Sequence, residues 1–167
     1  MRLFAILLCL CVALTLFGCT NNVQNKTSAA FYYCVNEIDH LNSRKVFGME
    51  ERNVISPSEN LLEFLNVYLE GPNSDDLYNP FPIGAAITNV KREGNVLTLN
   101  LSQHFDRLPI EKLSLAIACL VQTTFKNTSV PVVLLIPSGT FVDGTTYKTF
   151  TADSFLYSDD NTAYSTP

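Results

Sequence analysis

Residues 56–72 read SPSENLLEFLNVYLEGP and carry the clearest local structural signal in the chain. Ser56 and Glu59 have the spacing of a capping box, in which a hydroxyl and a carboxylate bind the free N–H groups of a first helical turn. Gly71-Pro72 is typical of a helix end. Between them, apolar residues at helical spacing share one face: Leu61, Phe64, Leu65, Tyr68 and Leu69. The pattern predicts an amphipathic helix over 57–70.

A hairpin and a second helix are predicted after this helix. Residues 86–91 and 96–101 resemble two strands, and Glu93-Gly94-Asn95 is suited to the tight turn between them. Pro109 can open the second helix, and Asn127 is a candidate C-cap. The apolar face of that helix contains Leu113, Ala116, Ile117, Leu120, Val121 and Thr124.

Four further segments are predicted strands, so strands and helices are mixed along the chain. Residues 31–35 are aromatic and β-branched, and 45–55 is a second, irregular candidate. The apolar run 131–136 suits a strand covered on both faces, and 145–150 suits an edge strand. Without the edge strand, the order β-β-α-β-β-α-β predicts an α+β fold, an antiparallel or mixed β-sheet with two helices packed on one face.

The composition excludes several classes of protein. The 167 residues are 47% hydrophobic and 16% charged, with a formal net charge of −5. The apolar fraction is too high for a disordered chain, and the negative charge argues against a nucleic-acid-binding protein.

The N-terminus has the pattern of a bacterial lipoprotein signal. Met1-Arg2 is a short basic region, and Leu3 to Leu16 is an apolar core too short for a comfortable transmembrane helix. Leu16-Phe17-Gly18-Cys19 resembles a lipobox, in which the Cys19 thiol carries the lipid. The alternative is a secretory signal, or an uncleaved anchor, with an incidental cysteine.

These observations divide the chain into four parts. Residues 1–18 are the predicted signal peptide, 19–30 a polar tether, 31–150 a single domain, and 151–167 a polar, disordered tail. The protein is expected on the outer face of the cytoplasmic membrane, held by acyl chains, in a Gram-positive bacterium.

Two cysteines remain in the predicted domain. Cys34 falls in an apolar strand and Cys119 in an apolar helix. They either fill the core as small apolar side chains or pair as a disulfide.

Four groups of residues follow one another in a recognisable order: Gly71-Pro72, Pro82-Ile83-Gly84, Leu99-Asn100-Leu101-Ser102 with Phe105, and the helix Leu115 to Thr123. Taken together, these groups resemble the GerMN domain of bacterial sporulation and spore-germination lipoproteins. The similarity covers residues 31–140. It implies a fold like the ring-building motifs of secretion-like complexes, and it brings no catalytic residue with it.

The residue patterns do not predict a catalytic or metal site. Ser102, His104 and Asp106 could be imagined as a triad but are confined to one loop, whereas such triads are assembled in space around a buried acid. Asp75-Asp76 lacks the alternating oxygen ligands of a calcium loop. No cofactor motif is present. The sequence therefore favours a protein that is not an enzyme.

The leading hypothesis is a membrane-tethered, non-catalytic scaffold or assembly module. Its partners would be envelope or sporulation-complex proteins or the cell wall, and Tyr78 and Phe81 in the loop 73–84 are the candidate contact residues. The edge near 145–150 is a second candidate surface. The alternative is a peptide- or glycan-binding lipoprotein, which an aromatic groove formed by Tyr32, Tyr78 and Phe81 would support.

We expect Cys19→Ser to abolish incorporation of labelled palmitate, because the substituted residue has no thiol to carry the lipid. The matched control is Cys11→Ser, which removes a thiol from the predicted signal and should leave labelling intact. Continued labelling of Cys19→Ser would contradict the lipobox interpretation.

Overall fold

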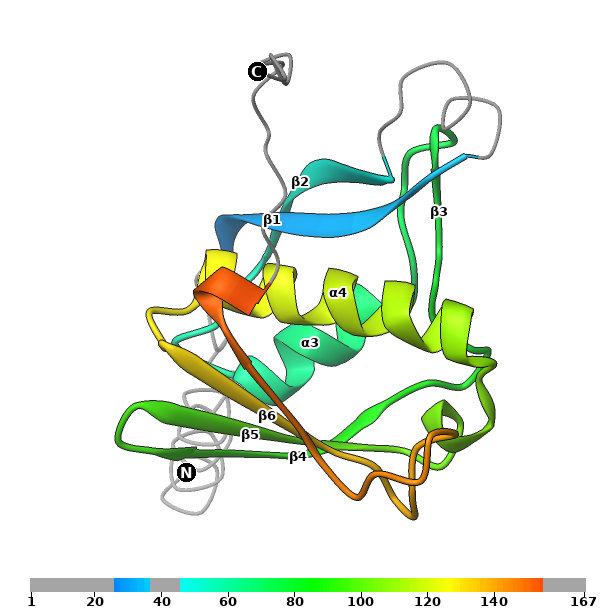
Figure 1. The fold of residues 1–167 in the computed structure, drawn as a ribbon. Coiled ribbons are helices and arrows are strands. Elements are labelled where there is room, and N and C mark those ends of the chain that lie inside the picture. Colours follow the sequence, from blue (N-terminus) through cyan, green and yellow to red (C-terminus); the bar gives the residue numbers. More distant parts are fainter. Residues whose placement is uncertain (1–25, 37–45, 155–167) are drawn as a thin grey trace, which may run out of the picture.

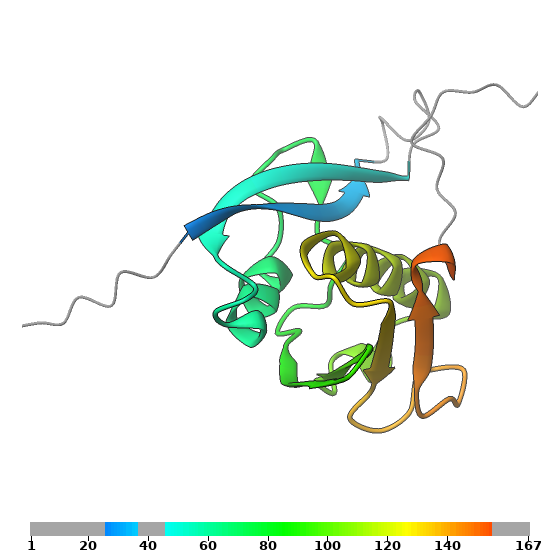
Figure 2. The same ribbon diagram turned by 90° about the vertical axis from the view of Figure 1, so that its left-hand side faces the viewer.

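Two α-helices lie between two β-sheets in the computed structural model, which describes residues 26–36 and 46–154 (Figures 1 and 2). Within these residues there are seven strands and two short 3-10 helices, Phe105–Arg107 and Ala152–Ser154. The predicted signal peptide, Cys19 and most of the tail lie outside the described residues. None of the helices in the described part of the chain is long and apolar enough to cross a membrane.

The first sheet, sheet A, has the strand order β2-β1-β3 and is antiparallel throughout. It consists of β1 (Lys26–Val35), β2 (Phe47–Ile55) and β3 (Leu77–Tyr78). β1 begins five residues earlier than predicted, so the last part of the expected tether belongs to the domain. Its first residues have weak strand propensity, but they pair in register with β2, from Lys26 opposite Ile55 onward. β3 was predicted as loop, and its pairing with the end of β1 makes it a strand.

The second sheet, sheet B, has the order β4-β5-β6-β7. Its strands are β4 (Ile87–Glu93), β5 (Val96–Leu101), β6 (Val132–Ile136) and β7 (Lys148–Thr151). The predicted hairpin is confirmed as β4–β5, and Gly94 takes the positive φ of 58° that its tight turn requires. β6 lies parallel to β5, while β7 is antiparallel to β6.

The expectation that β6 is covered on both faces is wrong. Val133 and Leu135 are buried, whereas Val132, Leu134 and Ile136 are only half-buried. The helices cover one face of sheet B and leave the other open, so the apolar run alternates between core and surface (Figure 2).

The first helix, α3 (Leu61–Leu69), begins four residues later than the predicted capping box. Ser56 instead closes an isolated turn, in which its carbonyl accepts from the N–H groups of Glu59 and Asn60. The capping box is formed by Asn60 and Glu63: the Asn60 side chain accepts from the Glu63 N–H and donates to the Glu63 carboxylate. The predicted apolar face is confirmed, because Phe64, Leu65, Tyr68 and Leu69 are all buried.

The second helix, α4 (Ile110–Asn127), begins after Pro109 as predicted, and Thr128 rather than Asn127 is its C-cap. α4 is buried over more than the predicted face. Cys119 and Thr123, which lie away from that face, are also fully buried. The reason is the layering: α4 has sheet B on one side and sheet A on the other (Figure 2).

The α+β class, the two helices and the mixed strand pairing are confirmed. The strands divide between two sheets instead of forming one, and the core fills both spaces between the sheets and the helices.

We expect Leu65→Ala to lower the free energy of unfolding by about 2–5 kcal/mol, because it leaves a cavity at a fully buried position. The control is Leu62→Ala on the exposed side of the same helix, which should change stability by less than about 0.5 kcal/mol. Urea denaturation followed by circular dichroism measures both, and equal stabilities would contradict this packing.

Candidate functional site

The two residues proposed as contact points have different surroundings. Tyr78, on β3, is 40% exposed, and its side chain hydrogen-bonds the sulfur of Cys34. Phe81 is only 6% exposed, and its ring packs between those of Tyr68 and Phe105 at centroid distances of 5.1 and 6.3 Å. Phe81 therefore belongs to the core and presents no ring to a partner.

The groove that would support the peptide- or glycan-binding alternative is not formed by the three aromatic residues proposed for it. Tyr78 lies opposite Cys34 in the register, so it shares a face of sheet A with Tyr32, two residues along β1. Phe81 does not join them, because it is enclosed in the core.

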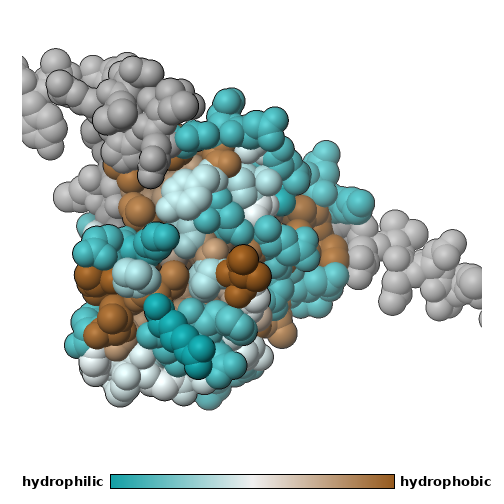
Figure 3. All heavy atoms as spheres, turned by 90° about the vertical axis from the view of Figure 1, so that its right-hand side faces the viewer, coloured by the Kyte–Doolittle hydropathy of each residue, from teal (hydrophilic) through white to brown (hydrophobic). Residues whose placement is uncertain are grey.

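Three loops come together at the end of the molecule where α4 begins, on the right-hand side of Figure 1. We call this region the loop end and define it as residues 82–86, 102–110 and 137–147, so that it includes the first residue of α4. It exposes four large apolar side chains: Ile83, fully exposed, and Ile110, Val142 and Tyr147. Figure 3 shows this side of the molecule, where apolar residues form separate areas surrounded by polar ones.

The residues once considered as a triad hold these loops together. The hydroxyl of Ser102 accepts from the Ala86 N–H and lies 3.3 Å from Nδ1 of His104. Asp106 accepts a hydrogen bond from the Gly139 N–H. Gly84 packs against the His104 ring, where a Cβ would lie 3.1 Å from Nε2. The hydrogen bonds that Ser102 and Asp106 accept from backbone N–H groups therefore join neighbouring loops.

Hydrogen bonds and an ion pair made by Asp143 stabilise the third loop, residues 137–147. Asp143 accepts from the N–H and hydroxyl of Thr145 and from the ammonium of Lys148, which also lies over the Phe141 ring. The hydrogen bond from Lys148 is the main reason that the pKa of Asp143 is lowered to about 2. The loop carrying Val142 and Tyr147 is thus held in shape at neutral pH.

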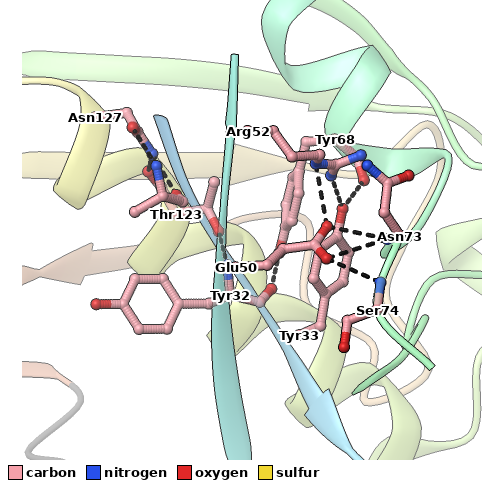
Figure 4. Close-up of polar contacts among 10 residues, drawn as sticks. Tyr32, Tyr33, Glu50, Arg52, Tyr68, Asn73, Ser74, Thr123 and Asn127 are labelled. Carbon is pink, nitrogen blue, oxygen red and sulfur yellow. Dashed lines mark hydrogen bonds and ion pairs between the residues drawn. The ribbon is translucent and has the colours of Figure 1, made fainter. Parts of the chain in front are cut away.

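A second group of polar residues, shown in Figure 4, positions β1 against the helices. β3 pairs only with Cys34 and Val35, so the rest of that edge of β1 has no neighbouring strand among the described residues. Side chains of α4 bond the backbone there in place of a strand. The Asn127 amide accepts from the Ala30 N–H at 3.1 Å and donates to the Ala30 carbonyl at 2.7 Å. Thr123 Oγ1 accepts from the Tyr32 N–H at 2.9 Å.

These contacts form a regular series, which we call the docking ladder. Cys119, Thr123 and Asn127 stand at i, i+4 and i+8 on α4. They face Cys34, Tyr32 and Ala30, which alternate along β1 in the opposite direction. Four helical residues rise about 6 Å and two strand residues about 6.7 Å, so the two repeats match over three contacts. The hydroxyl of Tyr68 on α3 adds a hydrogen bond to the Tyr32 carbonyl.

A charged pair, Glu50 and Arg52 of β2, lies on the other side of β1. Arg52 lies with its guanidinium 4.2 Å from the centroid of the Phe31 ring, and Nε is 3.1 Å from Glu50. Their side chains are only 13% and 12% exposed. Arg52 also donates to the Tyr33 hydroxyl, which donates to the Tyr68 carbonyl at 2.7 Å.

Glu50 extends this network to the loop that precedes β3. Its carboxylate accepts from the N–H groups of Asn73 and Ser74, at 3.1 Å each. Burial raises the pKa of Tyr33 and Tyr68 above the usual range, so both hydroxyls stay protonated and act as hydrogen-bond donors. The network therefore fixes the path of the chain toward Tyr78.

Sequence reasoning did not find the docking ladder or the buried charged pair. The sequence indicates Asn127 only as a candidate C-cap. It gives no sign that Glu50 and Arg52 are buried, because charged residues at this spacing are also common on exposed strands. Within the described residues, no group of three His, Cys, Asp or Glu side chains could hold a metal ion.

The structure resembles solved structures more clearly than the sequence resembles known proteins. No family model and no curated protein matches the sequence. The tandem GerMN domains of the sporulation protein GerM from Bacillus subtilis match with a TM-score of 0.54 at 15% identity, over 77% of this chain. The chain has the GerMN fold. It covers 46% of the GerM chain, which holds two such domains.

A candidate lipoprotein from Clostridium perfringens also matches. Its TM-score is 0.47 at 14% identity, and the match covers 81% of this chain and 93% of that one. The resemblance to the GerMN domain, first suggested by the order of turns and helices, is thus confirmed at the level of the fold by the GerM match.

We expect Thr123→Val to lower the free energy of unfolding by about 1–3 kcal/mol, because the isosteric side chain removes the acceptor of the Tyr32 N–H. Thr124→Val is the matched control. Thr124 is equally buried, but its hydroxyl donates to the Leu120 carbonyl within its own helix. Denaturant titration of both variants tests the docking ladder, which would be wrong if the two losses were equal.

Proposed function

We propose that this protein is a membrane-anchored extracytoplasmic lipoprotein whose GerMN-like domain acts as a non-catalytic assembly module. Cys19 carries the anchor, and the domain lies on the outer face of the cytoplasmic membrane of a Gram-positive bacterium. Its partners are proteins of the cell envelope, including complexes for sporulation or germination, or the cell wall. The work is done by contact and not by turnover.

The observation that supports this proposal most directly is the loop end. Ile83 is fully exposed, although transfer of an apolar side chain of this size out of water is favourable. Ile110, at the start of α4, and Val142 and Tyr147, on the third loop, are also exposed. These loops are joined by the contacts of Ser102 and Asp106 and braced at Asp143, so the apolar residues are displayed on a fixed support. A pre-organised surface loses little entropy when a partner binds.

Tyr78 is the second contact point in this proposal. It is partly exposed on β3, the strand that Figure 1 places on the same side of the molecule as the loop end. Aromatic residues often dominate binding energy when a partner buries them. The Glu50 contacts to Asn73 and Ser74 hold the approach to its strand. GerM is described as a sporulation protein, which is consistent with a role in an assembly.

We expect Ile83→Asp and Tyr78→Ala each to reduce capture of envelope proteins by the membrane-bound full chain, by about tenfold if the residue is an interface anchor. Leu62→Asp is the control: it also removes an exposed apolar side chain, from α3, and an acidic residue suits a first helical turn. Quantitative mass spectrometry of captured envelope extract measures the effect.

The outcome that contradicts the proposal is equal capture by all three variants and the natural protein, with folding confirmed by circular dichroism. A hydrolase activity of the protein that disappears on His104→Ala would contradict the non-catalytic role, since His104 would then serve chemistry and not only loop contact.

A further inference from the structure

The first contact of the docking ladder is a pair of thiols. Cys34 and Cys119 are fully buried, and their sulfur atoms lie 4.0 Å apart. Both are free cysteines in this structure. A disulfide has a sulfur–sulfur distance of about 2.05 Å, so the two atoms must approach by about 2 Å. We propose that Cys34 and Cys119 form a disulfide when the protein meets a small-molecule disulfide oxidant, fastening β1 covalently to α4.

The ladder itself supports this pairing. The contacts of Thr123 and Asn127 fix the register of α4 against β1 at the two following positions. The third position is therefore held in place by its neighbours, and the facing residues there are both cysteines. Polar contacts on one side and β3 pairing on the other keep Cys34 opposite Cys119.

The reaction is an ordinary thiol–disulfide exchange in two steps. The Cys34 thiolate attacks one sulfur of oxidised glutathione, forming a mixed disulfide and releasing one glutathione thiolate. The Cys119 thiol then loses its proton and attacks the Cys34 sulfur, forming the Cys34–Cys119 bond and releasing the second glutathione. The two cysteine protons pass to the two glutathione thiolates, so one disulfide is reduced as one forms.

The order of the two steps follows from the surroundings of the thiols. The hydrogen bond with Cys119 lowers the pKa of the Cys34 thiol, whereas burial raises that of Cys119. Cys34 is therefore the attacking residue. It is also the one nearer solvent, because its hydrogen-bonded neighbour Tyr78 is partly exposed, so movement of Tyr78 opens the route for the oxidant.

The bond would join segments 85 residues apart in the sequence. A crosslink over so long a loop restricts the unfolded chain, so the oxidised form should be the more stable. The inference depends on the geometry of the ladder and does not require the proposed function. An extracytoplasmic location would supply the oxidising conditions under which such bonds persist.

The test is to incubate the full chain with oxidised glutathione, block remaining thiols by alkylation, digest with trypsin without reduction, and analyse the peptides by mass spectrometry. Cleavage after Lys26, Arg44, Lys112 and Lys126 places the two cysteines on separate peptides, 27–44 and 113–126. We expect these peptides to be found crosslinked, with loss of two hydrogens. Two fully alkylated cysteines, or stable glutathione adducts on both, would overturn the proposal.

Melting temperatures give a second measurement. Oxidation should raise the Tm of the natural protein by several degrees, and dithiothreitol should reverse the increase. Cys34→Ala is the matched control, because it should show the same Tm with and without oxidant. An equal shift in Cys34→Ala would overturn the proposal.

The rate of oxidation tests the route past Tyr78. Tyr78→Ala should form the crosslinked peptides faster than the natural protein, and Tyr78→Phe, which keeps the ring, should stay close to the natural rate. Equal rates in all three proteins would contradict access at this position.

Discussion

The open edge of β1 is the constraint on which the rest of the fold depends. A strand edge has N–H and C=O groups that need partners, and within the part of the chain that the structure describes no strand pairs with most of that edge. Helix α4 meets this need with Thr123 and Asn127. Because the side chains that meet the edge stand one helical turn apart, the helix can satisfy the strand only in one register and direction.

This single register determines the layers. With one side of α4 fixed to sheet A, sheet B covers another side of the helix (Figure 2). Helix α3 is held in the same layer by Tyr68, whose ring stacks on Phe31 at 5.2 Å and whose hydroxyl reaches the Tyr32 carbonyl. The same contacts position the beginning of α4 and the loops around it. The position of the loop end therefore depends on residues on the other side of the core.

Much of the fold could be predicted from the sequence because periodicity is a local property. The main apolar face of each helix, the β4–β5 hairpin and the order of the elements apart from β3 follow from residue spacing alone. The start of β1 could not be predicted, because Lys26 to Ala30 become a strand through pairing with β2. The same holds for the two-sheet arrangement and for the capping box, where Asn60 competes locally with Ser56 and only the packing of α3 decides between them.

The candidate site was predictable only in part. Tyr78 is partly exposed, although it lies in strand β3 and not in the predicted loop. The burial of Phe81 depends on rings from α3 and the 3-10 helix after β5, which are distant in sequence. Ile83 belongs to the Pro82-Ile83-Gly84 group of the sequence analysis, and it is fully exposed on a turn closed by the hydrogen bond from the Ala85 N–H to the Pro82 carbonyl. Burial of a loop residue is decided by tertiary contacts that spacing does not encode.

The early start of β1 bears on the tether of the proposed lipoprotein. If Cys19 carries the lipid, the seven residues 19–25 precede the first strand residue, Lys26, and a fully extended chain of that length reaches at most about 24 Å. A tether ending at residue 30 would reach about 40 Å. β1 begins on the side of the molecule opposite the loop end (Figure 1). In that arrangement the domain is held close to the membrane, with the loop end on the far side from the point of attachment.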